Sequence, residues 1–285
     1  MVSAPGRRRQ VAHARKAWKL SLRRACALLE VPRSGANYES KKAIADAPVV
    51  GKMRELAAQY PRYGYRMIRG LLATKGIAMS ADRAHRLWRD AGLQVPRKRI
   101  RRRVAANRPR PVPPSAPNHV WAIDFVHDTC ADGRPLKCLT VIDEWTHECL
   151  AIDVGAGLRA SRVVEVLSRL VSLHGAPRYI RSDNGPEFIS KALMTWRNDE
   201  SIESAFIDPG KPWQNGTNES FNGRFREECL SLEWFRSRIE AKAVIETWRR
   251  HYNDVRPHSS LGGRTPNEFK RDLGIQRATP RLATP

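Results

Sequence analysis

Residues 96–117 restrict what this chain can fold into more than any other segment. Their sequence, PRKRIRRRVAANRPRPVPPSAP, contains six prolines and eight lysines or arginines in 22 positions. Proline lacks the backbone N–H that helices and strand ladders require, so this density excludes regular secondary structure. The segment therefore predicts an extended linker that divides the 285-residue chain into two folded parts.

The charge of the chain changes at the same place. Residues 1–117 carry 28 Lys or Arg and 6 Asp or Glu, whereas residues 118–285 carry 23 of each. The net charge of +22 thus lies in the first part, and such an excess indicates a polyanionic partner, either nucleic acid or an anionic membrane. No apolar run approaches the roughly 20 residues of a membrane-spanning helix, and the N-terminus has no signal-peptide hydrophobic region. We expect a cytoplasmic protein without a membrane partner.

A basic run has two readings. It can be a solvated connection, or it can lie along a phosphate backbone and add sequence-independent, salt-sensitive affinity. Its place between two domains favours contact with DNA.

The five cysteines are odd in number and show no C-x-x-C spacing, so we expect reduced thiols and neither a disulfide framework nor a cysteine zinc site.

The segment before the linker predicts two helical units. In residues 15–30, apolar side chains recur at helical spacing, and VPRS at 31–34 ends the pattern with Ser34 as a candidate N-cap. The aligned residues are Trp18, Leu22, Cys26 and Leu29.

The second unit begins near Tyr63. Ile68, Leu71 and Leu72 share one helix face, and Gly76 ends that helix. Ser80 is a candidate N-cap for a further helix, which would run through Leu87 and Trp88 to Gly92. Both units have the layout of helix-turn-helix modules, whose second helix enters the major groove. A structural helical hairpin is the alternative, and the positive charge favours DNA binding.

After the linker, helix-only patterns give way to alternating ones. Three early strands followed by alternating helices and strands predict a mixed α/β sheet layer. The expected strands are 120–126, 136–143, 148–154, 178–183 and 205–207, and the expected helices are 159–174, 187–200, 217–230 and 240–252.

Three carboxylates in this half lie in unusual places. Asp124 interrupts an apolar strand, on the pleat face of Ala122 and Val126, where an unpaired charge is costly. Asp183 ends a second strand, and Glu219 lies in the first turn of a helix. Strand ends and helix starts converge on one edge of a sheet. Acidic side chains gathered there suit Mg²⁺, and paired metal ions catalyse phosphodiester chemistry.

Each carboxylate also has a structural reading. Asp-Asn-Gly is a common turn sequence, Asp124 fits a buried structural acid, and Glu219 fits a capping carboxylate. Periodicity does not choose between these three and other acids of the same half. The competitors are Asp143, Glu144, Asp153 and Glu187.

A family resemblance makes that choice. The three carboxylates lie in the motifs WAIDF, SDNGPEF and QNGTNESFNGRFREECL. These motifs, with YGYR at 63–66, RRACALLEVPRSG at 23–35 and YNDVRPHSSLGGRTPNEF at 252–269, resemble the D-D-E transposases and retroviral integrases. The chain is most similar to the second-frame transposase of two-frame bacterial insertion sequences, over roughly residues 15–270.

The resemblance implies a ribonuclease-H-like integrase catalytic core, with a mixed five-stranded sheet and flanking helices, preceded by all-α helix-turn-helix modules. We accordingly divide the chain into five parts. They are the first helix-turn-helix-like segment (1–45), the second (46–95), the linker (96–117), the catalytic core with a C-terminal helical extension (118–272) and a tail (273–285).

The resemblance also implies residue roles. Asp124, Asp183 and Glu219 would be catalytic and would bind two Mg²⁺ ions, for which Mn²⁺ would substitute. No structural zinc module is expected. Asn184 would shape the turn that presents Asp183, and Arg226, seven positions after Glu219, would face DNA from the same helix side. The other expected DNA-binding residues are Arg224, Lys211, Arg97, Lys98, Arg99, Arg101, Arg102 and Arg103.

The implied activity is Mg²⁺-dependent strand cleavage and strand transfer at the ends of an insertion sequence. Expected partners are double-stranded DNA, further copies of the chain on DNA, and an upstream-frame protein or frameshift fusion. The implied location is bacterial and nucleoid-associated. The alternatives are a catalytically inactive DNA-binding regulator and a structure-directed nuclease on the same core.

Overall fold

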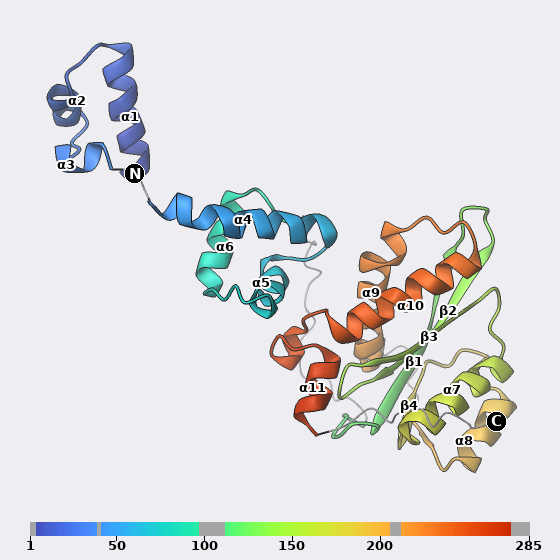
Figure 1. The fold of residues 1–285 in the computed structure, drawn as a ribbon. Coiled ribbons are helices and arrows are strands. Elements are labelled where there is room, and N and C mark those ends of the chain that lie inside the picture. Colours follow the sequence, from blue (N-terminus) through green and yellow to red (C-terminus); the bar gives the residue numbers. More distant parts are fainter. Residues whose placement is uncertain (1–3, 39–40, 97–111, 206–211, 275–285) are drawn as a thin grey trace, which may run out of the picture. The chain divides into compact units, whose positions relative to one another are not determined.

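The structure is a computed structural model that describes residues 4–38, 41–96, 112–205 and 212–274 (Figure 1). Contacts divide the chain into two units, Met1–Arg54 and Glu55–Pro285. Helix α4 (Lys41–Gln59) runs through both the unit boundary and the position between residues 45 and 46 where the sequence suggests a domain limit.

The first unit holds three short helices before α4. They are α1 (Ala4–Ala17), α2 (Leu22–Leu28) and α3 (Arg33–Ala36). A small apolar core joins them, since Val11 and Ala14 of α1 pack with Ala25 and Cys26 of α2. The unit is therefore folded around its own core.

The predicted single helix over residues 15–30 is wrong. Lys19 has a φ of 49°, in the left-handed region that ends a helix. Ser21 then caps α2 by accepting a hydrogen bond from Arg24 N. Trp18 fits the helical spacing but is 68% exposed. Ser34 is not an N-cap either, because α3 begins one residue before it.

The second unit begins with the predicted helix pair. Helices α5 (Tyr65–Thr74) and α6 (Ala81–Asp90) contact each other, and Ile68, Leu71 and Leu72 are buried. Ser80 caps α6 by accepting from Arg83 N. Gly76 and Gly92 follow the two helices with φ of 80° and 70°, a backbone conformation that glycine adopts without strain. These predictions are confirmed.

A five-stranded mixed sheet forms the centre of this unit, in the order β3-β2-β1-β4-β5. The first three strands are antiparallel neighbours, and β4 and β5 add on in parallel beside β1. The strands are β1 (Val120–Thr129), β2 (Pro135–Asp143), β3 (Cys149–Gly155), β4 (Tyr179–Arg181) and β5 (Glu203–Ser204).

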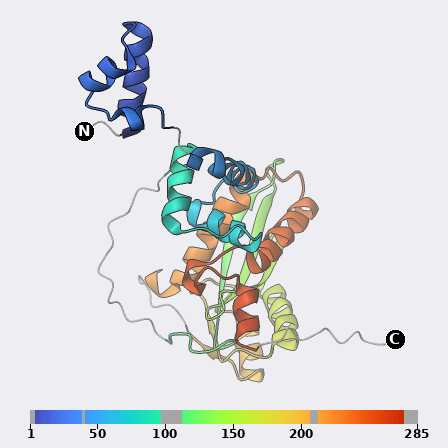
Figure 2. The same cartoon turned by 60° about the vertical axis from the view of Figure 1, so that its left-hand side comes forward.

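Helices cover both faces of the sheet (Figures 1 and 2). Side chains alternate along a strand, so Trp121 and Ile123 of β1 face α7 (Ala160–His174) and α8 (Lys191–Asp199). Val126 faces the opposite layer. That layer consists of α9 (Gly216–Glu228) and α10 (Arg238–Asp254).

Two predicted boundaries are wrong. The helix expected from Glu187 begins at Lys191, because Ser190 caps it and Phe188 belongs to the preceding turn. The last strand precedes its predicted start at Ala205, and residues 206 and 207 lie outside the described residues.

A C-terminal helix, α11 (Pro266–Asp272), was not predicted as a separate element. A nearly buried ion pair between Lys270 and Glu148 joins it to the sheet. The side-chain amide of Asn253 satisfies the backbone at the start of edge strand β3, because it donates to Cys149 O and accepts from Cys149 N. Short 3₁₀ turns occupy Pro212–Asn215, Leu230–Leu232 and Ser259–Leu261. Across the described ranges, every helix is too short or too polar to cross a membrane.

Candidate active site on the central sheet

Asp124 lies in the middle of β1, opposite Thr140 of β2. Its side chain is half-buried on the α9 side of the sheet, the face predicted from the sequence. One carboxylate oxygen accepts a hydrogen bond from Phe125 N (2.7 Å), and the other accepts from the Asn222 amide (2.8 Å). The carboxylate is therefore fixed in place by β1 and α9.

The pKa of Asp124 shows what surrounds it. This pKa is raised from 3.8 to about 6, first by burial of the carboxyl and also by the negative charge of Asp183. Hydrogen bonds from Phe125 N and Asn222, and the charge of Arg226, act in the opposite direction. Asp124 and Asp183 thus lie close enough to repel each other, and a cation between them would relieve that repulsion.

Asp183 follows β4 in a compact, exposed turn. Its carboxylate accepts a hydrogen bond from Gly185 N (3.0 Å), and Phe188 N donates to Gly185 O (2.9 Å). A Cβ at Gly185 would come within 3.0 Å of the Asp183 carboxylate, so this close turn favours glycine. Asn184 is exposed at its tip.

A buried cation supports the end of β4. Arg181, two residues before Asp183, forms an ion pair with Glu144 (3.1 Å), and both side chains are fully buried. Arg181 also donates to the carbonyl of Val112 (2.6 Å), where the linker enters the sheet domain. The strand that presents Asp183 is therefore held on two sides.

Glu219 is exposed in the first turn of α9. The helix lies along β1, since Asn218 donates to Ile123 O (3.0 Å), Asn222 to Asp124, and Arg226 to His127 O (3.3 Å). Residues three or four positions apart share a helix face, so Glu219 projects from near the face that contacts Asp124. A role for Asn218 and Asn222 was not predicted from the sequence. Their spacing of four residues, on either side of Glu219, would have indicated a polar helix face beside that carboxylate.

Aromatic side chains hold α9 against α10. Phe225 lies 5.0 Å from Trp248 between ring centroids, and Phe221 lies 5.0 Å from Tyr252. All four rings are buried. Such pairs add to the area buried and restrict the helix to one position.

The three carboxylates do not yet form one metal site. Within the described residues, no group of three His, Cys, Asp or Glu side chains is close enough to hold a metal ion. The charge of Asp183 acts on the pKa of Asp124, so these two carboxylates are near each other, and Glu219 lies on α9, which packs along the same strand. Carboxylate oxygens are nonetheless the donors that Mg²⁺ prefers, and the mutual repulsion of the two aspartates fits a cation there.

The four competing acids have structural partners. Their hydrogen bonds and ion pairs account for their positions without a metal ion. Asp143 accepts from Asn118 N and Thr146 N, Glu144 pairs with Arg181, Asp153 with Arg162, and Glu187 with Lys137.

The candidate DNA-binding residues fall into three groups. Arg226 is exposed beside the carboxylates, and Asn184 lies on the Asp183 turn. Arg224 lies toward Tyr252 and His258, on whose pKa values its charge acts. The remaining ones lie outside the described residues: Lys211, Arg97, Lys98, Arg99, Arg101, Arg102 and Arg103.

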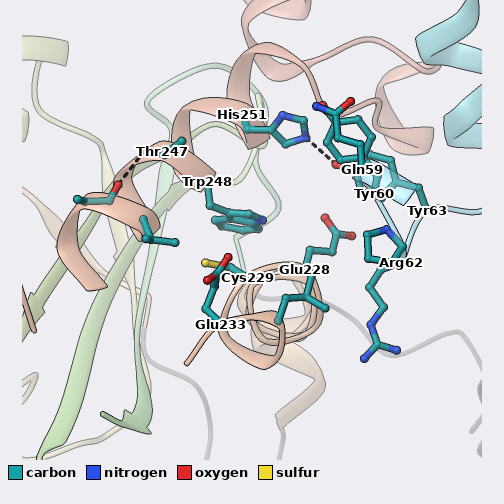
Figure 3. Close-up of a pocket in the computed structure, with 14 residues that line it drawn as sticks. Gln59, Tyr60, Arg62, Tyr63, Glu228, Cys229, Glu233, Thr247, Trp248 and His251 are labelled. Carbon is teal, nitrogen blue, oxygen red and sulfur yellow. Dashed lines mark hydrogen bonds between the residues drawn. The ribbon is translucent and has the colours of Figure 1, made fainter. Parts of the chain in front are cut away.

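A cavity of about 530 Å³ lies elsewhere in this unit, between the turn before α5, the end of α9, and α10 (Figure 3). Trp248 lines it, and the Tyr63 hydroxyl and the His251 ring form a 2.9 Å hydrogen bond at its side. None of the three carboxylates lines this cavity. The cavity is therefore separate from the three candidate carboxylates.

Family models match nearly the whole described sheet domain. The integrase core domain matches residues 114–212 and, in a second model, residues 200–266. An HTH-like domain matches residues 44–101, which include α5 and α6.

Relatives extend the match over most of the chain. A 31.7 kDa protein of insertion element IS407 from Burkholderia multivorans is 42% identical, over 88% of this chain and 90% of that protein. A 39.2 kDa protein of insertion element IS476 from Xanthomonas euvesicatoria is 40% identical, over 91% and 75%. The transposase InsD of element IS2D from Escherichia coli is 25% identical, over 79% of each.

Proposed function

Because the chain belongs to the integrase-core family of insertion-element transposases, we propose that it cuts and joins DNA strands at the ends of its own mobile element. Asp124, Asp183 and Glu219 are the catalytic residues of this proposal. The observation that carries it is the proximity of Asp124, on the central strand β1, to Asp183, at the end of the neighbouring β4, beside the helix that bears Glu219.

The carboxylates would hold two Mg²⁺ ions, or Mn²⁺ in their place. When bound, the ions would supply Lewis-acid stabilisation of the attacking and leaving oxygens of a phosphodiester. Glu219 would complete the site on binding of ions and DNA, since α9 already rests on β1 through Asn218 and Asn222.

The protein side chains would chiefly position the reactants. Asn222 orients the Asp124 carboxylate, and the Gly185 turn orients that of Asp183. Arg226, on the side of α9 next to β1, would contact a DNA phosphate. Water would first cleave an end phosphodiester and free a 3′ hydroxyl. That hydroxyl would then attack a second phosphodiester, an exchange that conserves the number of such bonds.

DNA binding would come from the basic first part of the chain. The HTH-like helices α5 and α6 would read the element end, and the arginines of the linker would contact phosphates. The first unit, α1 to α3, would add a second helix for DNA recognition. Assembly of several copies on DNA, and an upstream-frame partner or fusion, belong to the same proposal, which places the protein at the bacterial nucleoid.

The products formed on element-end DNA test this function. The full-length protein is incubated with labelled end DNA, a target duplex and Mg²⁺, and joined products are separated from nicked ones. We expect joined product that disappears with EDTA. Nicked product alone would favour a structure-directed nuclease, and binding without either product would favour an inactive regulator.

A further inference from the structure

An ion pair connects the turn that carries Asp183 to a distant strand. Lys137 of β2 lies 2.5 Å from Glu187, between Nζ and Oε1, and the side chains are 14% and 26% exposed. Strand β1 lies between β2 and β4 in the sheet. The pair therefore reaches over β1, from β2 to the turn that follows β4.

Aromatic rings fill the space beneath this ion pair. The Lys137 ammonium lies 3.9 Å from the centroid of the Phe125 ring, and Phe125 stacks on Phe188 at 4.8 Å with an angle of 11°. Phe125 directly follows Asp124, and Phe188 directly follows Glu187. Lys137, Phe125, Phe188 and Glu187, the brace, thus form a closed set of contacts.

The brace is connected to each of the two aspartates through neighbouring residues of the chain and a backbone hydrogen bond. On β1 it holds the residue next to Asp124. On the other side it holds Glu187 and Phe188, and Phe188 N is bonded to Gly185 O within the Asp183 turn. Asp183 itself is exposed and bonded to Gly185 N. A change in the brace would shift the Asp183 turn relative to β1.

An exposed ion pair contributes little to stability. This one is largely shielded and rests on an aromatic face, where cation–π attraction adds to the charge interaction. The pKa of Glu187 is lowered, first by its hydrogen bond from Lys137, so the carboxylate stays ionised and paired. Glu187 therefore acts as a partner of Lys137.

We propose that Lys137 and Glu187 are positioning residues that set the place of Asp183 against Asp124 and thereby the affinity of this aspartate pair for a divalent cation. This inference rests on the proposed function. It assigns the two residues no contact with DNA or with the ion, and their effect passes through the Asp183 turn.

Binding of Mn²⁺ to the full-length protein, followed by electron paramagnetic resonance, tests the brace. Glu187→Gln and Lys137→Met should each weaken Mn²⁺ binding by about tenfold, the usual scale for groups that orient metal ligands. The half-saturating Mg²⁺ concentration for strand joining should rise in parallel. The matched control is Asp132→Asn, which breaks an exposed ion pair with Arg134 in the β1–β2 hairpin and should change neither value.

Exchange of the two charges separates positioning from general stability. The double variant Lys137→Glu, Glu187→Lys should regain part of the Mn²⁺ affinity that the single variants lose, because it restores the ion pair but not the cation–π contact with Phe125. If single variants fold poorly, Glu187→Asp keeps the charge and shortens its reach, and should weaken Mn²⁺ binding by a few-fold at unchanged circular dichroism.

The outcomes separate this inference from the function on which it rests. Unchanged Mn²⁺ affinity in folded single variants, with normal binding by the wild type, would overturn the brace alone. A wild type that binds Mn²⁺ no better than Asp124→Asn would overturn the proposed site, and the brace with it. Loss of affinity that the charge exchange restores would support both.

Discussion

The side-chain amide of Asn222 donates a 2.8 Å hydrogen bond to the carboxylate of Asp124. The bond joins helix α9 to the central strand at the residue with the raised pKa. Asn222 lies three positions after Glu219, on the same side of α9. One contact therefore orients Asp124 and also locates the helix that carries the third carboxylate.

Removal of this amide should slow the reaction without unfolding the protein. Asn222→Ala deletes one hydrogen bond to a charged group, a loss of about 1.5 to 3 kcal/mol, so we expect strand joining to fall by roughly one to two orders of magnitude. The rate is measured at saturating Mg²⁺. Asn198→Ala, at an exposed position of α8, is the control and should keep the wild-type rate. Equal rates for both variants would show that Asn222 does not orient the site.

The pKa of Asp124 predicts a dependence of stability on pH in the absence of metal ions. Its folded value of about 6 lies above the ordinary 3.8, so ionisation of this carboxyl opposes folding. As pH falls from 7 to 4, the wild type should gain about 1 kcal/mol relative to Asp124→Asn, after allowance for solvent screening. Urea unfolding at several pH values in EDTA measures this difference. A constant difference would mean that Asp124 has an ordinary pKa in the folded protein.

The buried Arg181–Glu144 pair predicts a large loss of stability on removal of one partner. Arg181→Ala leaves a buried carboxylate without its cation, at a cost of about 3 to 5 kcal/mol. Arg178→Ala is the matched control, because the Arg178–Glu203 pair is 65% and 60% exposed and such pairs contribute about 1 kcal/mol or less. Both values come from urea unfolding. Similar losses for the two variants would contradict the role given to Arg181.

The linker charges predict a change in the salt dependence of DNA binding. Replacing Arg101, Arg102 and Arg103 with Gln should reduce the slope of log Kd against log salt by about 2 to 3, since each phosphate contact contributes about 0.9. The control replaces three exposed arginines of the neutral sheet domain: Arg134, Arg169 and Arg236. An equal change of slope for both triple variants would place the DNA contacts outside the linker.

The sequence predicts the sheet domain well because its apolar residues alternate or recur at regular spacing. Strand β1 and helix α7 follow directly from such patterns. Prediction from spacing fails where an apolar residue fits the helical period but the backbone is not helical at that position. Trp18 lies before a left-handed residue, and Phe188 lies in a turn rather than in α8.

The candidate site is only partly accessible to sequence reasoning. Motifs select Asp124, Asp183 and Glu219 as candidates, and local spacing places them within a strand, at a strand end and at a helix start, respectively. Contacts such as Lys137 with Glu187 depend on the strand order across the sheet, which periodicity does not specify. The described residues contain no group of three acids, histidines or cysteines close enough to hold a metal ion, and this too is a tertiary property that local spacing does not specify.

Strand joining by single carboxylate variants tests the central claim most directly. Asp124→Asn, Asp183→Asn and Glu219→Gln are compared with the wild type on element-end DNA with Mg²⁺, and Glu165→Gln, on an exposed side of α7, serves as the control. We expect each of the three variants to bind the DNA and to lose joining by at least about a thousandfold, whereas the control keeps wild-type activity. Wild-type joining by any of the three would contradict the assignment of that carboxylate to the active site.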